Sequence, residues 1–160
     1  MRVTIYAVGK LKAGPERELS ARYIDRFSKT GPARGLNFGR IVEIAESRAT
    51  DTATRKREEY EALQKQLPDD GVLLVLDERG STISSHDFAD LLANWADSGR
   101  RDLAIAIGGA DGHDGRLLDK ADKTLSFGKL TWPHQIVRIL LAEQLYRAAT
   151  ILSGHPYHRN

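Results

Sequence analysis

The sequence of 160 residues contains no cysteine. Disulfide bonds, thiolate zinc sites and cysteine nucleophiles are therefore excluded. Proline is sparse, and the contents of 41% hydrophobic and 29% charged residues are ordinary for a globular protein rather than a disordered one. We expect a single domain, residues 1–160, with a buried core.

Long apolar runs are also missing. The opening MRVTIYAVGK is typical of a short strand and lacks the apolar segment of a signal peptide. No apolar run approaches the roughly 18 residues that a membrane span needs. The sequence therefore predicts a cytoplasmic protein with no membrane partner.

A strong charge of one sign is absent as well, because the formal net charge is only +2. Residues 1–70 carry 14 Lys and Arg against 11 Asp and Glu, and residues 71–160 carry 10 against 11. Charge alone does not indicate a nucleic-acid-binding protein. Such a protein would have to gather its basic groups locally or by oligomerising.

What is present is a hydrophobic period that alternates between strand and helix. Strands are expected at 1–9, 36–45, 71–77 and 102–109, with a strand or extended loop at 124–131. Helices are expected at 15–28, from Thr50 or Asp51 to 67, from Ser84 or Ser85 to 96, at 115–122 and at 133–152. This order predicts an α/β fold, with an open, mostly parallel sheet and helices on both faces. The loop at 29–35 has the most flexible composition.

The last expected helix is apolar on more than one face. It should therefore lie at the centre of the monomer or be shared with a second subunit. Glu143 and Arg147 lie four residues apart and could form a pair, which would be worth little if it were solvated. Gly154 is expected as a left-handed C-terminal cap, and Pro156 prevents the helix from continuing.

Two loops follow the buried strands, at 76–80 and at 108–112. In open α/β sheets, ligands bind beyond the carboxyl ends of the strands. The glycines of GGADG would allow a ligand to approach the backbone closely. Their spacing fits neither the dinucleotide nor the phosphate-loop pattern, so a simple turn before a helix is an equally good interpretation.

A third segment, LSFGKLTWPHQ at 125–135, combines apolar side chains with a glycine. Apolar groups beside free backbone donors and acceptors suit an adenine ring. The alternative is a plain strand followed by a helix that begins with Pro133 at its first position.

The chain ends in SGHPYHRN, which is rich in groups that grip anions or move protons. His155 and His158 do not make a zinc site by themselves, because a third ligand such as His113 or His86 would be needed. We therefore expect no metal. SSHD at 84–87 predicts a helix cap, since adjacent residues cannot form a catalytic relay.

Three segments then carry a resemblance: IGGADG, LTWPHQIVRILLAEQLYRA and the terminal HPYHR. In this order, and with the opening YAVGK, they resemble the RlmH family of ribosomal large-subunit methyltransferases, which belongs to the SPOUT superfamily. The resemblance covers nearly the whole chain. The last two segments are long and specific.

The resemblance implies a sheet whose C-terminal segment forms a deep trefoil knot, in a homodimer that uses S-adenosyl-L-methionine. The implied activity is methylation of N3 of a pseudouridine in 23S rRNA on the assembled ribosome. The implied cofactor-binding residues are Leu76, Gly108, Gly109, Phe127, Gly128, Lys129, Leu130, Thr131 and Trp132. The implied catalytic residues are His155, Tyr157, His158 and Arg159, and these residues with Pro156 would line the RNA side.

The sequence departs from the family pattern at a few positions. Trp132 stands where leucine is expected, GGADG replaces the more usual GGPEG, and Asn160 replaces a residue that is often charged. Only the first change bears on the shape of the adenine pocket, and none alters the tail histidines.

The chemistry needs a base for a weakly acidic imide N–H and donors for its two carbonyl oxygens. His155 or His158 could be the base, while Arg159 and Tyr157 could stabilise the oxyanion or hold a phosphate. Tyr157 could instead stack on a base. Two other functions fit the sequence: a knotted methyltransferase acting on tRNA or another RNA, and a non-enzymatic, ribosome-associated RNA-binding module.

Overall fold

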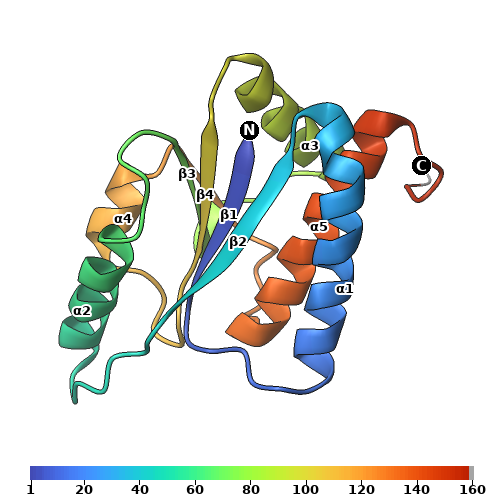
Figure 1. The fold of residues 1–160 in the computed structure, drawn as a ribbon. Coiled ribbons are helices and arrows are strands. Elements are labelled where there is room, and N and C mark those ends of the chain that lie inside the picture. The colour runs from blue at the N-terminus through green and yellow to red at the C-terminus, as the bar shows by residue number, and fades with distance from the viewer. Residues whose placement is uncertain (159–160) are drawn as a thin grey trace.

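The computed structural model describes residues 1–158, in which strands and helices alternate along the chain (Figure 1). The strands are β1 (Arg2–Val8), β2 (Asn37–Ile44), β3 (Val72–Ser81), β4 (Asp102–Ile107) and β5 (Lys123–Leu125). The helices are α1 (Pro15–Thr30), the 3-10 helix η1 (Gly31–Arg34), α2 (Thr52–Gln64), α3 (Ser85–Asp97), α4 (Gly115–Lys120) and α5 (His134–Ser153).

The five strands form one sheet in the order β2-β1-β4-β3-β5, and every neighbouring pair is parallel. Helices α1, α3 and α5 cover one face, and α2 and α4 lie against the other (Figure 1). The predicted α/β fold is therefore confirmed. Because all strands point the same way, their carboxyl ends meet at one edge of the sheet.

The core is divided by the sheet into two clusters, as the two-residue period of a strand requires. In β1, Val3, Ile5 and Ala7 face the α1, α3 and α5 side, whereas Tyr6 and Val8 face α2 and α4. The central strands are buried on both faces. Their continuous apolar sequences follow from this burial.

Helix α5 occupies the centre of its layer and packs against both α1 and α3. The buried Arg138 of this helix contacts the main chain at the end of β1, where its Nη2 donates to the carbonyl oxygens of Val8 and Gly9. Nη1 donates to Glu43 Oε1 of β2 at 2.7 Å. A buried guanidinium needs such partners, and they fix the first half of α5 beside the carboxyl edge of the sheet.

The predicted caps are present. Asp51 caps α2, and Ser84 caps α3 in a reciprocal arrangement with Asp87. Gly154 ends α5 with φ +66°, the left-handed conformation that glycine adopts without strain. Among the described residues, no helix has the length and apolar character needed to cross a membrane.

One sequence prediction is refined and two need correction. Of the strand or extended loop expected at 124–131, only the start belongs to a strand, β5, which ends at Leu125, and a loop follows it. The loop expected at 29–35 contains a 3-10 helix packed through the buried Gly31, which has no room for a side chain against Leu36. Pro133 is the N-cap of α5 rather than its first helical residue.

Candidate functional site

A cavity of about 630 Å³ opens at the carboxyl edge of the sheet. Its walls come from the ends of β3 and β4, the segment after β5 and the first turn of α5, which adjoin because β4, β3 and β5 are neighbours in the sheet. This volume is in the range of cavities that hold small-molecule ligands, and its place is the usual one for an α/β sheet.

The cavity lining contains eight of the nine residues that the resemblance assigned to cofactor binding. They are Leu76, Gly108, Gly109, Phe127, Gly128, Leu130, Thr131 and Trp132. Lys129, the ninth, is not among the lining residues. The structure thus brings the glycine loop and the apolar bend together, although Gly108 and Leu125 are 17 positions apart in the sequence.

Close packing favours glycine in the loop after β4. A Cβ on Gly108 would lie 3.1 Å from the Gly112 carbonyl carbon, and one on Gly109 would lie 3.0 Å from Val8 Cγ1. Gly112 has φ +77°, in the left-handed region. The loop therefore presents backbone atoms rather than side chains to the cavity.

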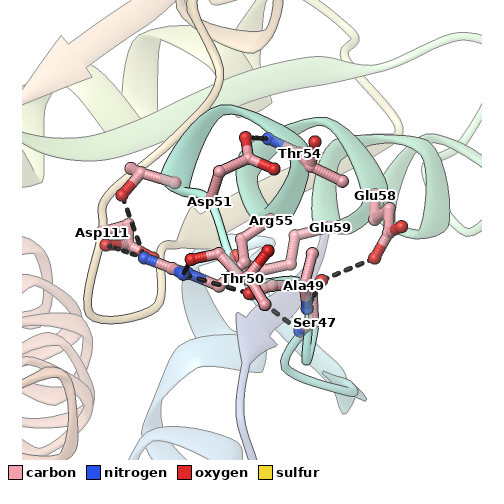
Figure 2. A network of polar contacts seen from close by, with 10 residues as sticks. Ser47, Ala49, Thr50, Asp51, Thr54, Arg55, Glu58, Glu59 and Asp111 are labelled. Atoms are coloured by element: carbon pink, nitrogen blue, oxygen red, sulfur yellow. Dashed lines mark hydrogen bonds and ion pairs between the residues drawn. The ribbon is translucent and has the colours of Figure 1, made fainter.

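The loop is fastened to the start of α2 by Arg55 (Figure 2). Its guanidinium holds Asp111 with two hydrogen bonds, Nε to Oδ2 at 2.6 Å and Nη2 to Oδ1 at 3.1 Å. Nη1 also donates to the carbonyl oxygens of Ala49 and Thr50. This contact lowers the pKa of Asp111 and keeps its carboxylate charged. The sequence carries no local signal for this ion pair, because 56 positions separate its members.

His113 is the buried polar side chain of this wall. Burial lowers its pKa to about 4, so the ring is neutral at pH 7. Its Nε2 has no hydrogen-bond partner among the described residues. The sequence had suggested His113 only as a possible metal ligand, and its burial became visible only in the fold.

Asp77 supplies a negative charge at the end of β3. Burial by itself would raise the pKa of its carboxyl, but hydrogen bonds from the backbone and guanidinium of Arg79 outweigh this effect, and the net pKa is lowered. The Asp77 side chain is 5% exposed, and that of Arg79 is 66% exposed. The cavity therefore carries a fixed carboxylate beside a solvent-facing cation.

The bend after β5 is held by Ser126. Its hydroxyl donates to the Gly128 carbonyl oxygen at 2.8 Å and accepts from the Gly128 N–H at 3.2 Å. Gly128 has φ +122°, which side chains disfavour. The bend leaves Leu130 and Trp132 exposed at the mouth of the cavity, at 73% and 41%.

The tail residues lie at the other end of α5 (Figure 1). His134 lines the cavity at the start of this 20-residue helix, whereas His155 follows its end. The helix is about 30 Å long, so within one chain the tail and the cavity are far apart. His158 instead contacts His86 and Arg147, and Tyr157 contacts Glu143. Arg159 lies outside the described residues.

The predicted pair of Glu143 and Arg147 is present and mostly buried. Arg147 Nε donates to Glu143 Oε1 at 2.9 Å, and the two side chains are 26% and 15% exposed. It is therefore not a solvated surface pair. In the described part of the chain, no group of three or more His, Asp or Glu side chains could hold a metal ion.

The chain is similar to known proteins along its whole length. The family model described as "Predicted SPOUT methyltransferase" matches residues 1–158. The chain is 64% identical to ribosomal RNA large subunit methyltransferase H of Agrobacterium fabrum (strain C58) and 63% identical to that of Rhizobium rhizogenes (strain K84), with 99% of each chain covered. The chain belongs to the RlmH family of SPOUT methyltransferases.

Distantly related solved structures share the fold. A probable methyltransferase from Bordetella pertussis Tohama I matches with a TM-score of 0.55, at 12% identity, over 92% of this chain and 93% of that one. A probable methylase family protein from Haemophilus influenzae Rd KW20 matches with a TM-score of 0.53, at 12% identity, over 99% and 70%. These likenesses concern the fold alone, whereas the RlmH relatives match along their full length.

Proposed function

We propose that the protein transfers a methyl group from S-adenosyl-L-methionine to N3 of a pseudouridine in 23S rRNA, as a homodimer acting on the ribosome in the cytoplasm. The observation that carries the proposal is the cavity at the carboxyl edge, formed by the segments that the family resemblance assigned to the cofactor. The names of the relatives favour ribosomal RNA over tRNA and an enzyme over a passive binding module.

The lining fits an adenosyl ligand in its chemistry. Leu76, Ile107 and Phe127 offer apolar surface, while Gly108 and Gly109 offer backbone donors and acceptors at close range. The unpartnered Nε2 of His113 is a buried polar atom in the same wall. When bound, S-adenosyl-L-methionine supplies an electrophilic sulfonium methyl group.

The protein must then orient the uracil ring and assist loss of the N3 proton. The tail carries suitable groups: imidazoles that can take a proton, and donors that can stabilise charge on the two carbonyl oxygens. His155 is exposed and can meet an RNA substrate. We assign Tyr157, His158 and Arg159 to the same RNA-facing segment.

A second subunit would bring the tail of one chain close to the cavity of the other. In a dimer with twofold symmetry, two α5 helices that run in opposite directions place each tail beside the other cavity. The half-buried Ile136, Ile139 and Leu140 on α5, with the exposed Leu130 and Trp132, offer apolar surface for this contact. Each site would then contain residues from both chains.

The family fold also implies that the C-terminal segment is threaded in a trefoil knot within a single domain of residues 1–160. Gly80 closely approaches the Leu125 backbone and Ser126 N donates to Ser81 O, which pairs the end of β5 with β3. A knot would hold the bend that lines the cavity against the sheet.

Mixing of inactive variants tests the shared site. One variant ends after Gly154 and lacks the tail; the other carries Thr131→Trp, which fills the cavity from an exposed lining residue. Each homodimer should be inactive in a ribosome methylation assay read by mass spectrometry of the rRNA. Equal mixing should restore about a quarter of wild-type activity, since half of the dimers then hold one complete site.

A chain that carries both changes is the control, because mixing it with either single variant should restore nothing. Absence of recovery in the first mixture, with heterodimers present, would contradict the shared site. Calorimetry with S-adenosyl-L-methionine tests the cofactor separately: a folded protein that gives no heat would contradict the proposed activity. Methylation of tRNA instead of 23S rRNA would support the alternative substrate.

A further inference from the structure

The tail folds back after Gly154 and places the His158 ring between α3 and α5. On one side, His158 Nδ1 lies 3.1 Å from Arg147 Nη1 of α5. On the other, His158 Nε2 lies 3.0 Å from His86 Nε2 of α3, and the two rings meet edge to face with centroids 4.7 Å apart. Both nitrogens of His158 are therefore engaged within the chain.

The chemistry of these partners fixes the position of the ring proton. Arginine has only donors, so His158 Nδ1 must accept from Arg147. The neutral ring then carries its proton on Nε2 and donates it to His86, whose Nε2 accepts. A doubly protonated His158 would place an N–H against the guanidinium, so this arrangement selects one neutral tautomer.

The docking site is itself rigidly supported. Glu143 accepts from Arg147 Nε at 2.9 Å and from the Tyr157 hydroxyl at 3.0 Å. The Tyr157 ring packs on Tyr146, with centroids 4.6 Å apart. Burial, followed by hydrogen bonding to Tyr23 and Glu143, raises the pKa of Tyr157, so its hydroxyl remains a donor.

We propose that His86 and Arg147 are positioning residues that hold the tail through His158 in its Nε2–H tautomer. His158 is then the anchor of the tail and not its proton acceptor. His155 is exposed, and its Nδ1 accepts a hydrogen bond from the Tyr157 N–H at 3.2 Å. This inference rests on the proposed function, because it concerns the same tail.

Nitrogen-15 correlation spectra of the histidine rings test the tautomer directly. At roughly pH 8, where free imidazole is neutral, wild-type His158 should show a protonated Nε2 and an unprotonated Nδ1. His86→Ala and Arg147→Ala should convert this pattern to the averaged signal of a free ring. A protonated Nδ1 in the wild type, or an unchanged pattern in both variants, would overturn the proposal.

Turnover gives the second readout. His86→Ala should lower kcat about 10- to 100-fold and leave cofactor affinity unchanged, because the tail is misplaced while the cavity is intact. His86→Gln should restore most of the rate, since its amide oxygen can accept from His158 Nε2. Equal rates for the two substitutions would contradict a hydrogen-bonding role for His86.

Ser85→Ala provides a matched control. Its hydroxyl donates to Gln144 across the same contact between α3 and α5, and no hydrogen bond joins it to the tail residues that the structure describes, so turnover and the His158 spectrum should stay as in the wild type. The spectra do not require activity. If wild-type protein shows the expected tautomer but methylates no rRNA, the proposed function fails while the docking inference stands.

Discussion

The two ends of α5 lie beside two different structures, an open cavity and a cluster of polar side chains. At its start, one chain assembles a cavity from three strand ends, with a glycine loop held by Arg55 and a bend held by Ser126. At its end, the same chain assembles a cluster of histidine, arginine, glutamate and tyrosine side chains bonded to one another.

This difference indicates that the two ends of α5 have different roles. The cavity combines backbone and apolar atoms with the charged side chains of Asp77 and Arg79, whereas the polar groups of the tail cluster are bonded to one another. The helix between them keeps the two apart by about 30 Å. Ligand binding should therefore depend on the first end alone, and turnover on both.

Removal of the tail is the strongest test of this division. A chain that ends after Gly154 should bind S-adenosyl-L-methionine within about twofold of the wild-type affinity, while turnover falls at least about 10³-fold, since base and oxyanion donors are lost together. Calorimetry and a ribosome methylation assay measure the two effects. Equal turnover in the shortened chain would remove the tail from the mechanism.

Gly80→Ala tests the cavity end without touching the tail. A Cβ at Gly80 would lie 2.5 Å from the Leu125 carbonyl carbon, so β5 and the bend must move. Unfolding in urea should show a loss of about 3 kcal/mol, with cofactor affinity at least tenfold weaker. Gly115→Ala is the control, since in the described part of the chain an added Cβ would meet no atom within 4 Å beyond its chain neighbours and its own helix, and both quantities should be unchanged.

Acid should weaken the cavity end through His113. Its pKa is about 4 in the folded protein, below the ordinary 6.5, so stability is lost as pH falls from about 6.5 toward 4. Between pH 7 and 5 the loss should be about 2 kcal/mol in urea unfolding. His113→Leu should remove this part of the pH dependence. The chain without its tail should keep it; disappearance there would assign the effect to the tail histidines.

Arg55→Lys should have the smallest effect. Lysine cannot hold Asp111 with two parallel hydrogen bonds, so the glycine loop should loosen and cofactor affinity should fall about fivefold, or about 1 kcal/mol. The matched control is Arg57→Lys, at an exposed position of the same helix, which should leave affinity as it is. A similar loss in both variants would show that charge on α2 matters rather than the fastening of the loop.

Much of the architecture could be predicted from the sequence. Val72–Leu76 and Leu103–Ile107 are continuous apolar runs because these strands are buried on both faces, and Asp51, Ser84 and Gly154 mark helix ends by their capping chemistry. The cavity residues came from the family resemblance, since spacing of the glycines alone left a simple turn equally plausible.

The contacts between distant polar residues could not be predicted from the sequence around each residue. Arg55 and Asp111 are 56 positions apart, and His86 and His158 are 72 apart. Each pair joins groups that look like ordinary polar residues in the sequence. Their partners depend on which helix lies beside which strand end.

The sequence by itself determined the alternation of strands and helices and the ends of most helices, because hydrophobic period and capping are local properties. Only the tertiary structure decided that Arg55 holds Asp111, that His113 is buried and that His158 docks on His86. These outcomes depend on contacts between distant segments. Such contacts form only when the parallel sheet brings its strand ends together and α5 sets the distance between cavity and tail.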